Sequence, residues 1–383
     1  MRGLNDGNAG VAFRSLATTM KKRQDATAPQ SSIVNSFNEW DPLEEVIVGV
    51  LEGAAIPSWH ITLAATMPES QQDLFRQRGG SLFPEELIRR GAQELEEFVH
   101  ILEAEGVKVR RPQPINHARP FETPAWRSEG GVYNAMPRDL LLVVGNDIIE
   151  APMSWRSRYF EIDSYRPLLK EYFMQGARWT SAPKPQLLDE LYDFSYVESE
   201  DPDNPRFVIN EFEPTFDAAD FIRCGRDIFA QRSHVTNRFG IDWLQRHLGD
   251  DYRVHLLDIR DPAPMHVDAT FMPLAPGKLL VNPERIRELP KMFSTWDVLE
   301  APKPTIPASH PMFMSSTWVS MNVLMLDEER VVVERQEEPL IRALEDWEFK
   351  VIRCDFRHVM SFGGAFHCVT CDVRRRGPLR SYF

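Results

Sequence analysis

The chain has 383 residues and a formal net charge of −13, and 43% of its residues are hydrophobic. This length and apolar content can bury a large core, while the acidic balance argues against a nucleic-acid-binding protein and against docking on anionic membranes. Four cysteines are too few for a disulfide framework, which favours a reducing, cytoplasmic compartment. No apolar run reaches the ~20 residues that a membrane span requires.

The first 34 residues differ in composition from the rest of the chain. They are basic, rich in Ala, Ser, Thr and Gln, and show no hydrophobic period. A transit peptide would also be basic, but Asp6 and Asp25 weaken that interpretation, and we expect a flexible tail over residues 1–34. Residues 35–383 are expected to form a single domain.

The ordered part is expected to begin with a strand, a helix and a second strand. Residues 45–50 form a β-rich run, and apolar residues recur at helical spacing after Pro84. Pro84 suits the first turn of a helix and Gly106 suits its C-terminal cap, so a long helix is predicted between them. Residues 107–109 then predict a short strand.

Four β-hairpin patterns follow, at residues 138–149, 219–229, 269–281 and 321–333. The Gly145-Asn146 turn is the clearest of them, and a helix and a strand follow the second and fourth hairpins. The last three hairpins begin about 50 residues apart, and repetition of a ββαβ unit at this period predicts a pseudo-symmetric, propeller-like α/β ring. The alternative is an ordinary mixed α/β domain. Residues 152–184 and 186–206 are interpreted as insertions between the units.

Polar and reactive residues stand at or just before the start of these hairpins. They are Asp139, Asp217 with Asp220, His266 with Asp268, Ser315 with Ser316, and Cys368 near the end of the chain. In a ring of repeated units, equivalent positions face one centre. We therefore expect these side chains to meet in one site.

Cys368 is the candidate nucleophile, because the paired glycines Gly363 and Gly364 let backbone approach a ligand closely. A buried structural thiol is the alternative. On a strand, the neighbouring His367 would point to the opposite face, so His266 is the predicted imidazole partner. Cys368 and Cys371 form a Cys-x-x-Cys pair, but the segment is strand-like and has no second pair, so neither a metal nor a redox site is predicted.

Asp217 and Asp220 lie in an apolar run, where like charges are costly unless a cation pairs with them. A planar guanidinium could bind both carboxylates, and solvated aspartates in a turn are the alternative. His266 and Asp268 would share one face of a strand, which favours an acid/base role for His266. The sequence contains no Walker loop or Rossmann glycine motif, so no cofactor is predicted.

The sequence resembles the L-arginine amidinotransferase family from about Asn35 to the C-terminus. The motifs that carry this resemblance are residues 38–45 (NEWDPLEE), 135–139 (AMPRD), 216–223 (FDAADFIR), 264–266 (PMH) and 363–368 (GGAFHC). The family has a five-bladed α/β propeller fold of ββαβ units, the pentein type, which agrees with the repeat pattern. The resemblance therefore implies this fold for residues 35–383.

The resemblance also implies a reaction, in which the amidino group of L-arginine passes to a small primary amine and L-ornithine is released. In this ping-pong transfer Cys368 becomes an amidino-cysteine, His266 acts as acid and then as base, and carboxylates hold the guanidinium and the donor amine. The implied carboxylates are Asp139, Asp217 and Asp268. The other implied substrate-binding positions are Arg285, for the donor carboxylate, and Ser315, Ser316 and Met265 along the arginine site.

Ala263 departs from the glycine-using members of the family, which have Asn at this position. Loss of that amide predicts an acceptor larger or less polar than glycine, as in natural-product or toxin biosynthesis. The alternatives are glycine amidinotransferase activity, a guanidine hydrolase of the arginine deiminase type, and a non-catalytic binding propeller. A homodimer is also expected, whereas the identity of the amine does not follow from the sequence.

Overall fold

The computed structural model describes residues 32–199, 201, 204–286, 288–312 and 314–383. Residues Ile33–Phe383 form one compact unit. The predicted N-terminal tail, residues 1–34, lies outside the described residues except for its last three positions. No helix in the described part of the chain is long and apolar enough to cross a lipid bilayer.

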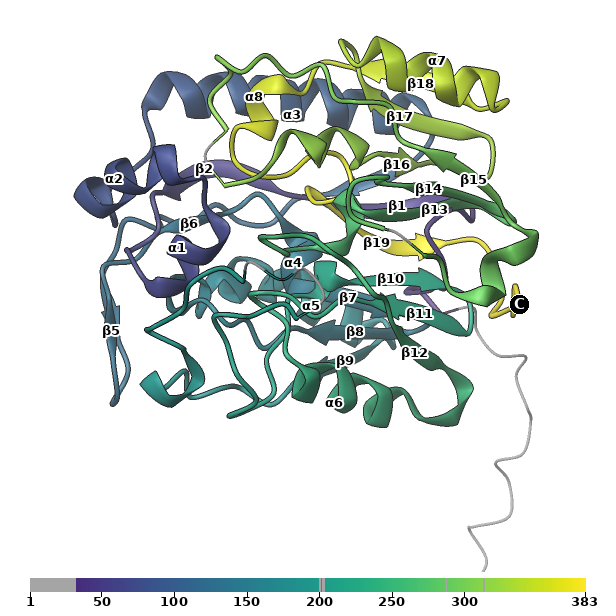
Figure 1. The fold of residues 1–383 in the computed structure, drawn as a ribbon. Helices are drawn as coiled ribbons and strands as arrows, with labels where there is room; N and C mark the ends of the chain where they lie inside the picture. Colours follow the sequence, from purple (N-terminus) through teal and green to yellow (C-terminus); the bar gives the residue numbers. More distant parts are fainter. Residues whose placement is uncertain (1–31, 200, 202–203, 287, 313) are drawn as a thin grey trace, which may run out of the picture. The chain divides into compact units, whose positions relative to one another are not determined.

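Five three-stranded sheets form the core of residues 33–383 (Figure 1). In each sheet an antiparallel pair is extended by a parallel third strand. In sheet order the strands are β19 (Thr370–Arg375), β1 (Leu43–Val48) and β3 (Lys108–Arg110); β7 (Leu141–Val144), β8 (Asp147–Glu150) and β9 (Arg178–Ser181); β10 (Phe221–Cys224), β11 (Asp227–Ala230) and β12 (Arg253–Leu256); β13 (Phe271–Ala275), β14 (Lys278–Val281) and β15 (Asp297–Glu300); β16 (Leu324–Met325), β17 (Arg330–Glu334) and β18 (Lys350–Cys354).

The second and third strands of each sheet are joined through a helix or a 3₁₀ turn. The connecting elements are α3 (Glu85–Ala104), α5 (Arg166–Met174), α6 (Arg238–Leu248), the 3₁₀ helix η7 (Lys291–Thr295) and α7 (Glu338–Asp346). The C-terminal strand β19 pairs with the N-terminal strand β1, so the two ends of the chain complete one sheet together. The α/β fold prediction is confirmed, and five sheets of this kind are consistent with the predicted five-bladed propeller of ββαβ units.

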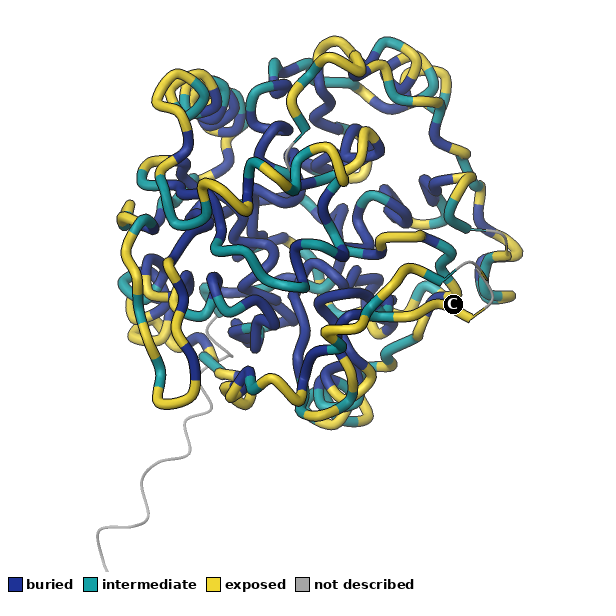
Figure 2. The backbone as a smooth tube through the Cα atoms, turned by 60° about the vertical axis from the view of Figure 1, so that its left-hand side comes forward, coloured by how far each residue is buried: buried dark blue, intermediate teal, exposed yellow. Residues whose placement is uncertain are grey.

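The inner strands are buried along their whole length, including the charged residues that some of them carry. All residues of β7, β8, β10 and β11 are buried, because neighbouring sheets and the connecting helices cover both faces of these strands. Figure 2 shows this pattern, with buried backbone along the strands and exposed residues along the outer helices. The third strands β9 and β12 are only half-buried or exposed.

Helix α3 follows directly from its sequence pattern. Pro84 caps its N-terminus, and Gly106, with φ of +85°, lies just past its C-terminus. Its buried side is a stripe at helical spacing, formed by Gly91, Leu95, Phe98, Val99 and Leu102. The prediction of a long helix between Pro84 and Gly106 is therefore confirmed.

Three smaller helices and two short sheets lie outside the five three-stranded sheets. The helices are α1 (Ile61–Thr66), α2 (Glu69–Arg78) and α8 (Arg357–Met360). Strand β2 (Val50–Ala55) pairs with β6 (Val132–Asn134), and β4 (Phe121–Glu122) pairs with β5 (Arg127–Ser128). The interpretation of residues 152–184 as an insertion is wrong. These residues contain α5 and β9 and so complete the second ββαβ unit.

A short turn precedes the first strand of each sheet and carries the polar residues singled out in the sequence. These turns are α4 (Pro137–Leu140) and the 3₁₀ helices η4 (Ala218–Asp220), η6 (Val267–Ala269) and η8 (Thr317–Met321), together with the loop before β19 that holds Cys368. Contacts between α4 and η4, η4 and η6, and η6 and η8 bring these turns together. The predicted convergence on one centre is therefore confirmed.

Candidate active site

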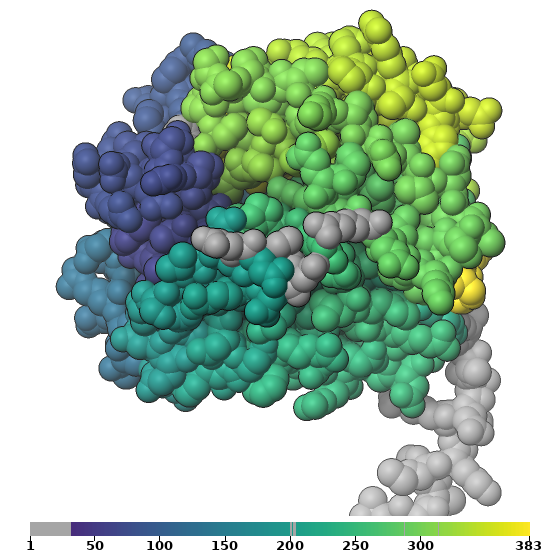
Figure 3. All heavy atoms as spheres, in the orientation of Figure 1, coloured from purple at the N-terminus to yellow at the C-terminus, as the bar shows by residue number. Residues whose placement is uncertain are grey.

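Cys368 lies at the bottom of a cavity of about 760 Å³ and is 3% exposed. The cavity wall comes from distant parts of the chain, near residues 61–72, 196–198, 261–269 and 314–322, and these segments meet on the face seen in Figure 3. Gly364 is required beside the thiol, because a Cβ there would lie 2.7 Å from the Cβ of Cys368. Gly363 has φ of +99°, a conformation that side chains disfavour.

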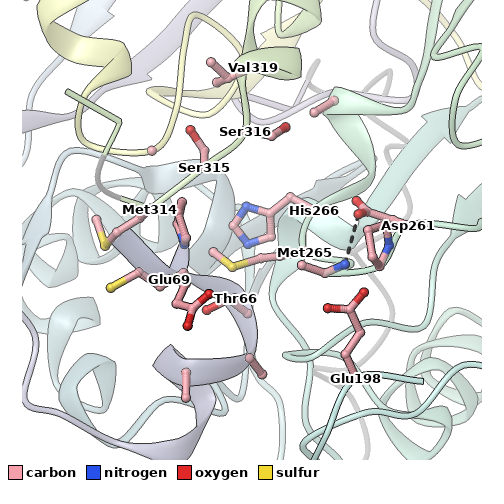
Figure 4. A pocket seen from close by; sticks show the side chains of 18 of the residues that line it. Thr66, Glu69, Glu198, Asp261, Met265, His266, Met314, Ser315, Ser316 and Val319 are labelled. Carbon is pink, nitrogen blue, oxygen red and sulfur yellow. Dashed lines mark hydrogen bonds between the residues drawn. The ribbon is translucent and has the colours of Figure 1, made fainter. Parts of the chain in front are cut away.

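His266 lies in the cavity wall (Figure 4), and a ring nitrogen lies within 4.8 Å of the Cys368 thiol. Its Nε2 is 3.1 Å from Asp217 Oδ2, and its Nδ1 is 3.6 Å from Asp139 Oδ1. Burial alone would lower the pKa of His266, but the charge of Asp139 and the hydrogen bond to Asp217 raise it well above its usual value. His266 is therefore held as an imidazolium that can donate a proton.

The local conformation of His266 differs from the prediction. The residues after it form the 3₁₀ helix η6 rather than a strand, and His266 itself has φ of +61°. Such a conformation is uncommon for a residue with a side chain and is found where surrounding contacts enforce it. His266 and Asp268 thus reach the same site from a tight turn, not from one face of a strand.

The thiol of Cys368 stands among negative charges. Its Sγ donates to Asp268 Oδ2 at 3.4 Å, and its backbone N–H donates to Asn322 Oδ1 at 2.9 Å. Burial, followed by the charge of Asp268, raises the pKa of Cys368 to about 12, although a hydrogen bond with His266 opposes this shift. In the empty site Cys368 is therefore a protonated thiol at neutral pH.

Asp268 is fixed by a chain of buried contacts that leads into the core. His367 Nδ1 lies 2.7 Å from Asp268 Oδ2, and His367 Nε2 lies 3.2 Å from Glu39 Oε2. Burial raises the pKa of Asp268, but its hydrogen bond and ion pair with His367 lower it below its usual value. His367 thus contacts Asp268 rather than the thiol next to it in sequence.

Asp139 and Asp217 share a buried arginine, Arg158, whose Nη1 is 2.9 Å from Asp139 Oδ2 and 3.5 Å from Asp217 Oδ2. The other oxygen of each carboxylate, Oδ1, is buried and has no hydrogen-bond partner among the described residues. Burial raises the pKa of Asp139, while the charges of His266 and Arg158 oppose the rise. Asp139 Oδ1 lies 3.6 Å from His266 Nδ1, and neither Oδ1 atom accepts a hydrogen bond from a described residue.

Asp220 does not share a ligand with Asp217, so that prediction is wrong. Its carboxylate accepts hydrogen bonds from Gln231 Nε2 at 2.7 Å, Ser233 Oγ at 2.6 Å and Thr236 Oγ1. Burial raises the pKa of Asp220 to about 6. Asp220 therefore ties η4 to the loop after β11 and does not face the cavity.

Arg285 lies at the rim of the cavity. Its Nη2 donates to Ser316 Oγ at 3.0 Å, and its Nη1 pairs with Asp261 Oδ2 at 3.1 Å. Burial lowers the pKa of Arg285 despite the opposing charge of Asp261. The other predicted substrate-binding residues in the cavity wall are Ser315, Ala263 and Met265.

Two residues of the site were missed from the sequence. Asn322 lies at the start of the fourth hairpin, at the same repeat position as the other polar residues, so the repeat pattern could have identified it. Arg158 falls in a segment interpreted as an insertion, and no local pattern marks it. Its role depends on carboxylates that are distant in sequence.

One cluster in the described part of the chain has metal-ligating geometry. The ligand atoms of Asp139, His266 and Cys368 lie within 4.8 Å of one another. The same three side chains also supply a carboxylate, an acid/base and a nucleophile, which is the set that covalent group transfer requires. No further cofactor is needed to account for this arrangement.

Comparison with known proteins identifies the family, although no family model matches the chain. The L-arginine:L-lysine amidinotransferase of Pseudomonas savastanoi pv. phaseolicola is 58% identical over 363 residues, covering 95% of this chain and 99% of the relative. The mitochondrial glycine amidinotransferase of Gallus gallus is 48% identical over 390 residues, covering 100% and 92%. The structure of SxtG, an amidinotransferase from Microseira wollei in the saxitoxin biosynthetic pathway, is 55% identical with a TM-score of 0.86, covering 92% and 100%. The chain belongs to the amidinotransferase family.

The charge around the thiol leads to a prediction for Asp268→Asn. This change removes a negative charge beside Cys368, so the pKa of the thiol falls and its alkylation by iodoacetamide at pH 8 becomes faster. Each unit of pKa corresponds to about a threefold gain in rate, since the larger thiolate fraction is partly offset by weaker nucleophilicity. Site-resolved mass spectrometry measures the rate at Cys368.

Cys371 is the internal control for this experiment. It is buried outside the cavity, and burial raises its pKa to about 12 as well, so it stays unmodified in both proteins. An alkylation rate at Cys368 that is unchanged or lower in Asp268→Asn contradicts the assigned charge effect.

Proposed function

We propose that the chain transfers the amidino group of L-arginine to a primary amine other than glycine and releases L-ornithine through an amidino-cysteine at Cys368. The observation that carries this proposal is a pair of buried oxygens without a hydrogen-bond partner among the described residues, Asp139 Oδ1 and Asp217 Oδ1, on carboxylates that contact the His266 imidazole close to the thiol. A buried acceptor without a donor is costly. A guanidinium has planar N–H groups that suit two carboxylates and places its electrophilic carbon beside the sulfur.

The first half-reaction removes ornithine. The cationic guanidinium lowers the pKa of the Cys368 thiol, which releases its proton to water, and the thiolate attacks the guanidinium carbon. A C–S bond forms and the bond from this carbon to the side-chain nitrogen of ornithine breaks, while the His266 imidazolium gives its proton to that nitrogen. Asp139 and Asp217 stabilise the imidazolium before transfer.

The second half-reaction uses the same imidazole in the opposite sense. Neutral His266 takes a proton from the incoming amine as the amine nitrogen attacks the amidino carbon. The C–S bond then breaks, the new guanidine leaves, and the thiolate regains a proton. One site thus serves two substrates in turn, as a ping-pong transfer requires.

The rim of the cavity suits amino-acid substrates. Among the described residues that line the cavity, Arg285 is the only arginine, and there is no lysine. With Ser316 it can bind the α-carboxylate of L-arginine. Glu69 and Glu198 also line the cavity and form no ion pair within the described part of the chain (Figure 4). Their charge favours entry of cationic substrates such as arginine and an amine.

The acceptor is proposed to be larger than glycine, in natural-product or toxin biosynthesis. Ala263 lines the cavity close to Met265 and presents only a methyl group to it. The relative whose name includes L-lysine is 58% identical, whereas the glycine amidinotransferase of Gallus gallus is 48% identical. Glycine amidinotransferase activity and guanidine hydrolysis are the alternatives. Four free cysteines fit a cytoplasmic location, and a homodimer stays a prediction.

The covalent intermediate gives the first test of this proposal. Enzyme incubated with L-arginine alone is expected to carry an amidino group on Cys368 and to release about one ornithine per active site, because no amine is present to accept the group. Mass spectrometry of the quenched protein locates the adduct. Cys368→Ala forms none, whereas the matched variant Cys371→Ala keeps it.

Rapid and continuous release of urea or citrulline without an added amine would instead support the hydrolase alternative. Under these conditions an unmodified Cys368, together with an absence of ornithine, excludes the proposed transfer.

The acceptor prediction is tested with Ala263→Asn. The introduced amide offers a polar contact and fills space, so kcat/KM for glycine relative to L-lysine is expected to rise about tenfold, the effect of roughly one hydrogen bond. Ornithine release is followed with each acceptor. The arginine half-reaction serves as the control and should change little, and a wild-type protein that prefers glycine contradicts the proposal.

A further inference from the structure

Arg158 stands behind the carboxylates that face the thiol and is 2% exposed. Its Nε donates to Glu161 Oε2 at 2.7 Å, while its Nη1 contacts Asp139 Oδ2 and Asp217 Oδ2 at 2.9 and 3.5 Å. The arginine comes from the 3₁₀ helix η1 (Arg156–Arg158), whereas the two aspartates belong to the turns before β7 and β10. One guanidinium thus joins the leading turns of two different blades.

The two oxygens of each aspartate carboxylate have different surroundings. Arg158 holds Oδ2 of both Asp139 and Asp217, and Oδ1 of each remains without a hydrogen-bond partner in the described part of the chain. Two buried carboxylates that face each other repel, and one of them would retain a proton in the absence of a nearby cation. Arginine keeps its charge at every working pH, so it can prevent this in the empty site.

We propose that Arg158 is a positioning residue for amidino transfer, which keeps the Asp139–Asp217 pair charged before substrate arrives and turns the free Oδ1 atoms toward the guanidinium. It acts through these carboxylates and does not touch the reacting atoms. This inference rests on the proposed function of the site. It adds to that function an explanation of why the carboxylates are charged before substrate binds, namely their contacts with Arg158.

The charged and titratable neighbours of this pair are contributed by several elements. His266, Asp220 and Cys368 face it from the other turns, and Glu161 and Tyr133 contact or face Arg158 from behind. Burial raises the pKa of Asp139, and the charges of His266 and Arg158 hold the rise in check. Burial also raises the pKa of Glu161 to about 7 against the opposing charge of Arg158.

A purely structural role is the competing explanation, in which Arg158 only fastens η1 to the core. The pH dependence separates the two roles. Binding of the guanidinium needs a charged Asp139 carboxylate, so the pH profile of kcat/KM for L-arginine has an acid limb, where this carboxylate takes up a proton. Removal of the Arg158 charge raises the pKa of Asp139, and this acid limb must then move to higher pH.

The test compares Arg158→Met and Arg158→Lys with the wild type, by following ornithine release across pH with L-arginine and L-lysine as substrates. In Arg158→Met the acid limb is expected to move up by about one pH unit or more, with about a hundredfold loss of kcat/KM at pH 7. Arg158→Lys keeps the positive charge but lacks the planar guanidinium that contacts both carboxylates. Its acid limb is therefore expected to stay in place, while KM for L-arginine rises about tenfold. Arg156→Lys is the matched control from the same 3₁₀ helix and should change neither quantity.

A uniform loss of kcat/KM at all pH values in Arg158→Met, with an unmoved acid limb, overturns the proposal in favour of the structural role. Should Arg158→Met fail to fold in circular dichroism, Arg158→Lys decides, and a wild-type KM for L-arginine in that variant overturns the proposal. Absence of ornithine release by the wild-type protein would instead refute the proposed function, which is a separate result.

Discussion

Negative charge buried at the centre of the five sheets is the constraint on which this structure depends. Asp372, in β19, contacts Arg138, Arg223 and Arg375 at 2.7–2.8 Å, and the resulting charges hold its pKa well below the usual range. Glu39 pairs with Arg223 as well. A buried carboxylate left without its cation would be strongly destabilising, so these pairs also determine how the blades meet.

The active site extends this network toward the cavity. Glu39 contacts His367, His367 contacts Asp268, and Asp268 contacts the thiol of Cys368. On the other side, Arg158 supports Asp139 and Asp217, which in turn hold His266. The reactive groups thus lie at the ends of two buried series of ion pairs and hydrogen bonds. Their orientation is fixed by contacts that extend into the core.

Charge balance also links the empty site to its chemistry. Carboxylates keep His266 protonated, and burial together with the charge of Asp268 keeps the thiol protonated despite the nearby imidazolium, so the nucleophile is inactive until further positive charge arrives. A guanidinium supplies that charge at the point where two carboxylate oxygens lack donors. The substrate therefore helps to generate the thiolate that attacks it, which limits reaction of Cys368 with other electrophiles.

Much of this arrangement follows from the sequence, because the repeat places polar residues before the first strand of each sheet. Asp139, Asp217, His266 and Cys368 all obey that pattern. Asp220 obeys it too, yet side chains from the loop after β11 satisfy its carboxylate, and such partners leave no periodic signal.

Two other features depend on tertiary contacts that no local pattern encodes. The positive φ of His266 is enforced by its surroundings, so hydrophobic alternation wrongly predicted a strand there. Arg158 lies in a segment whose Pro, Trp and Tyr residues obscured the strand β9, so that the segment was interpreted as an insertion and not as part of the second ββαβ unit. Its significance appears only when the carboxylates from other blades are placed around it.

Exchange of label between the two amino acids of the first half-reaction tests the central claim most directly. If Cys368 accepts the amidino group before any amine binds, enzyme given L-arginine and isotopically labelled L-ornithine, with no other amine, must form labelled L-arginine. Cys368→Ala must abolish this exchange. No exchange in the wild-type protein, under conditions where it turns over with an added amine, would contradict a covalent intermediate on Cys368.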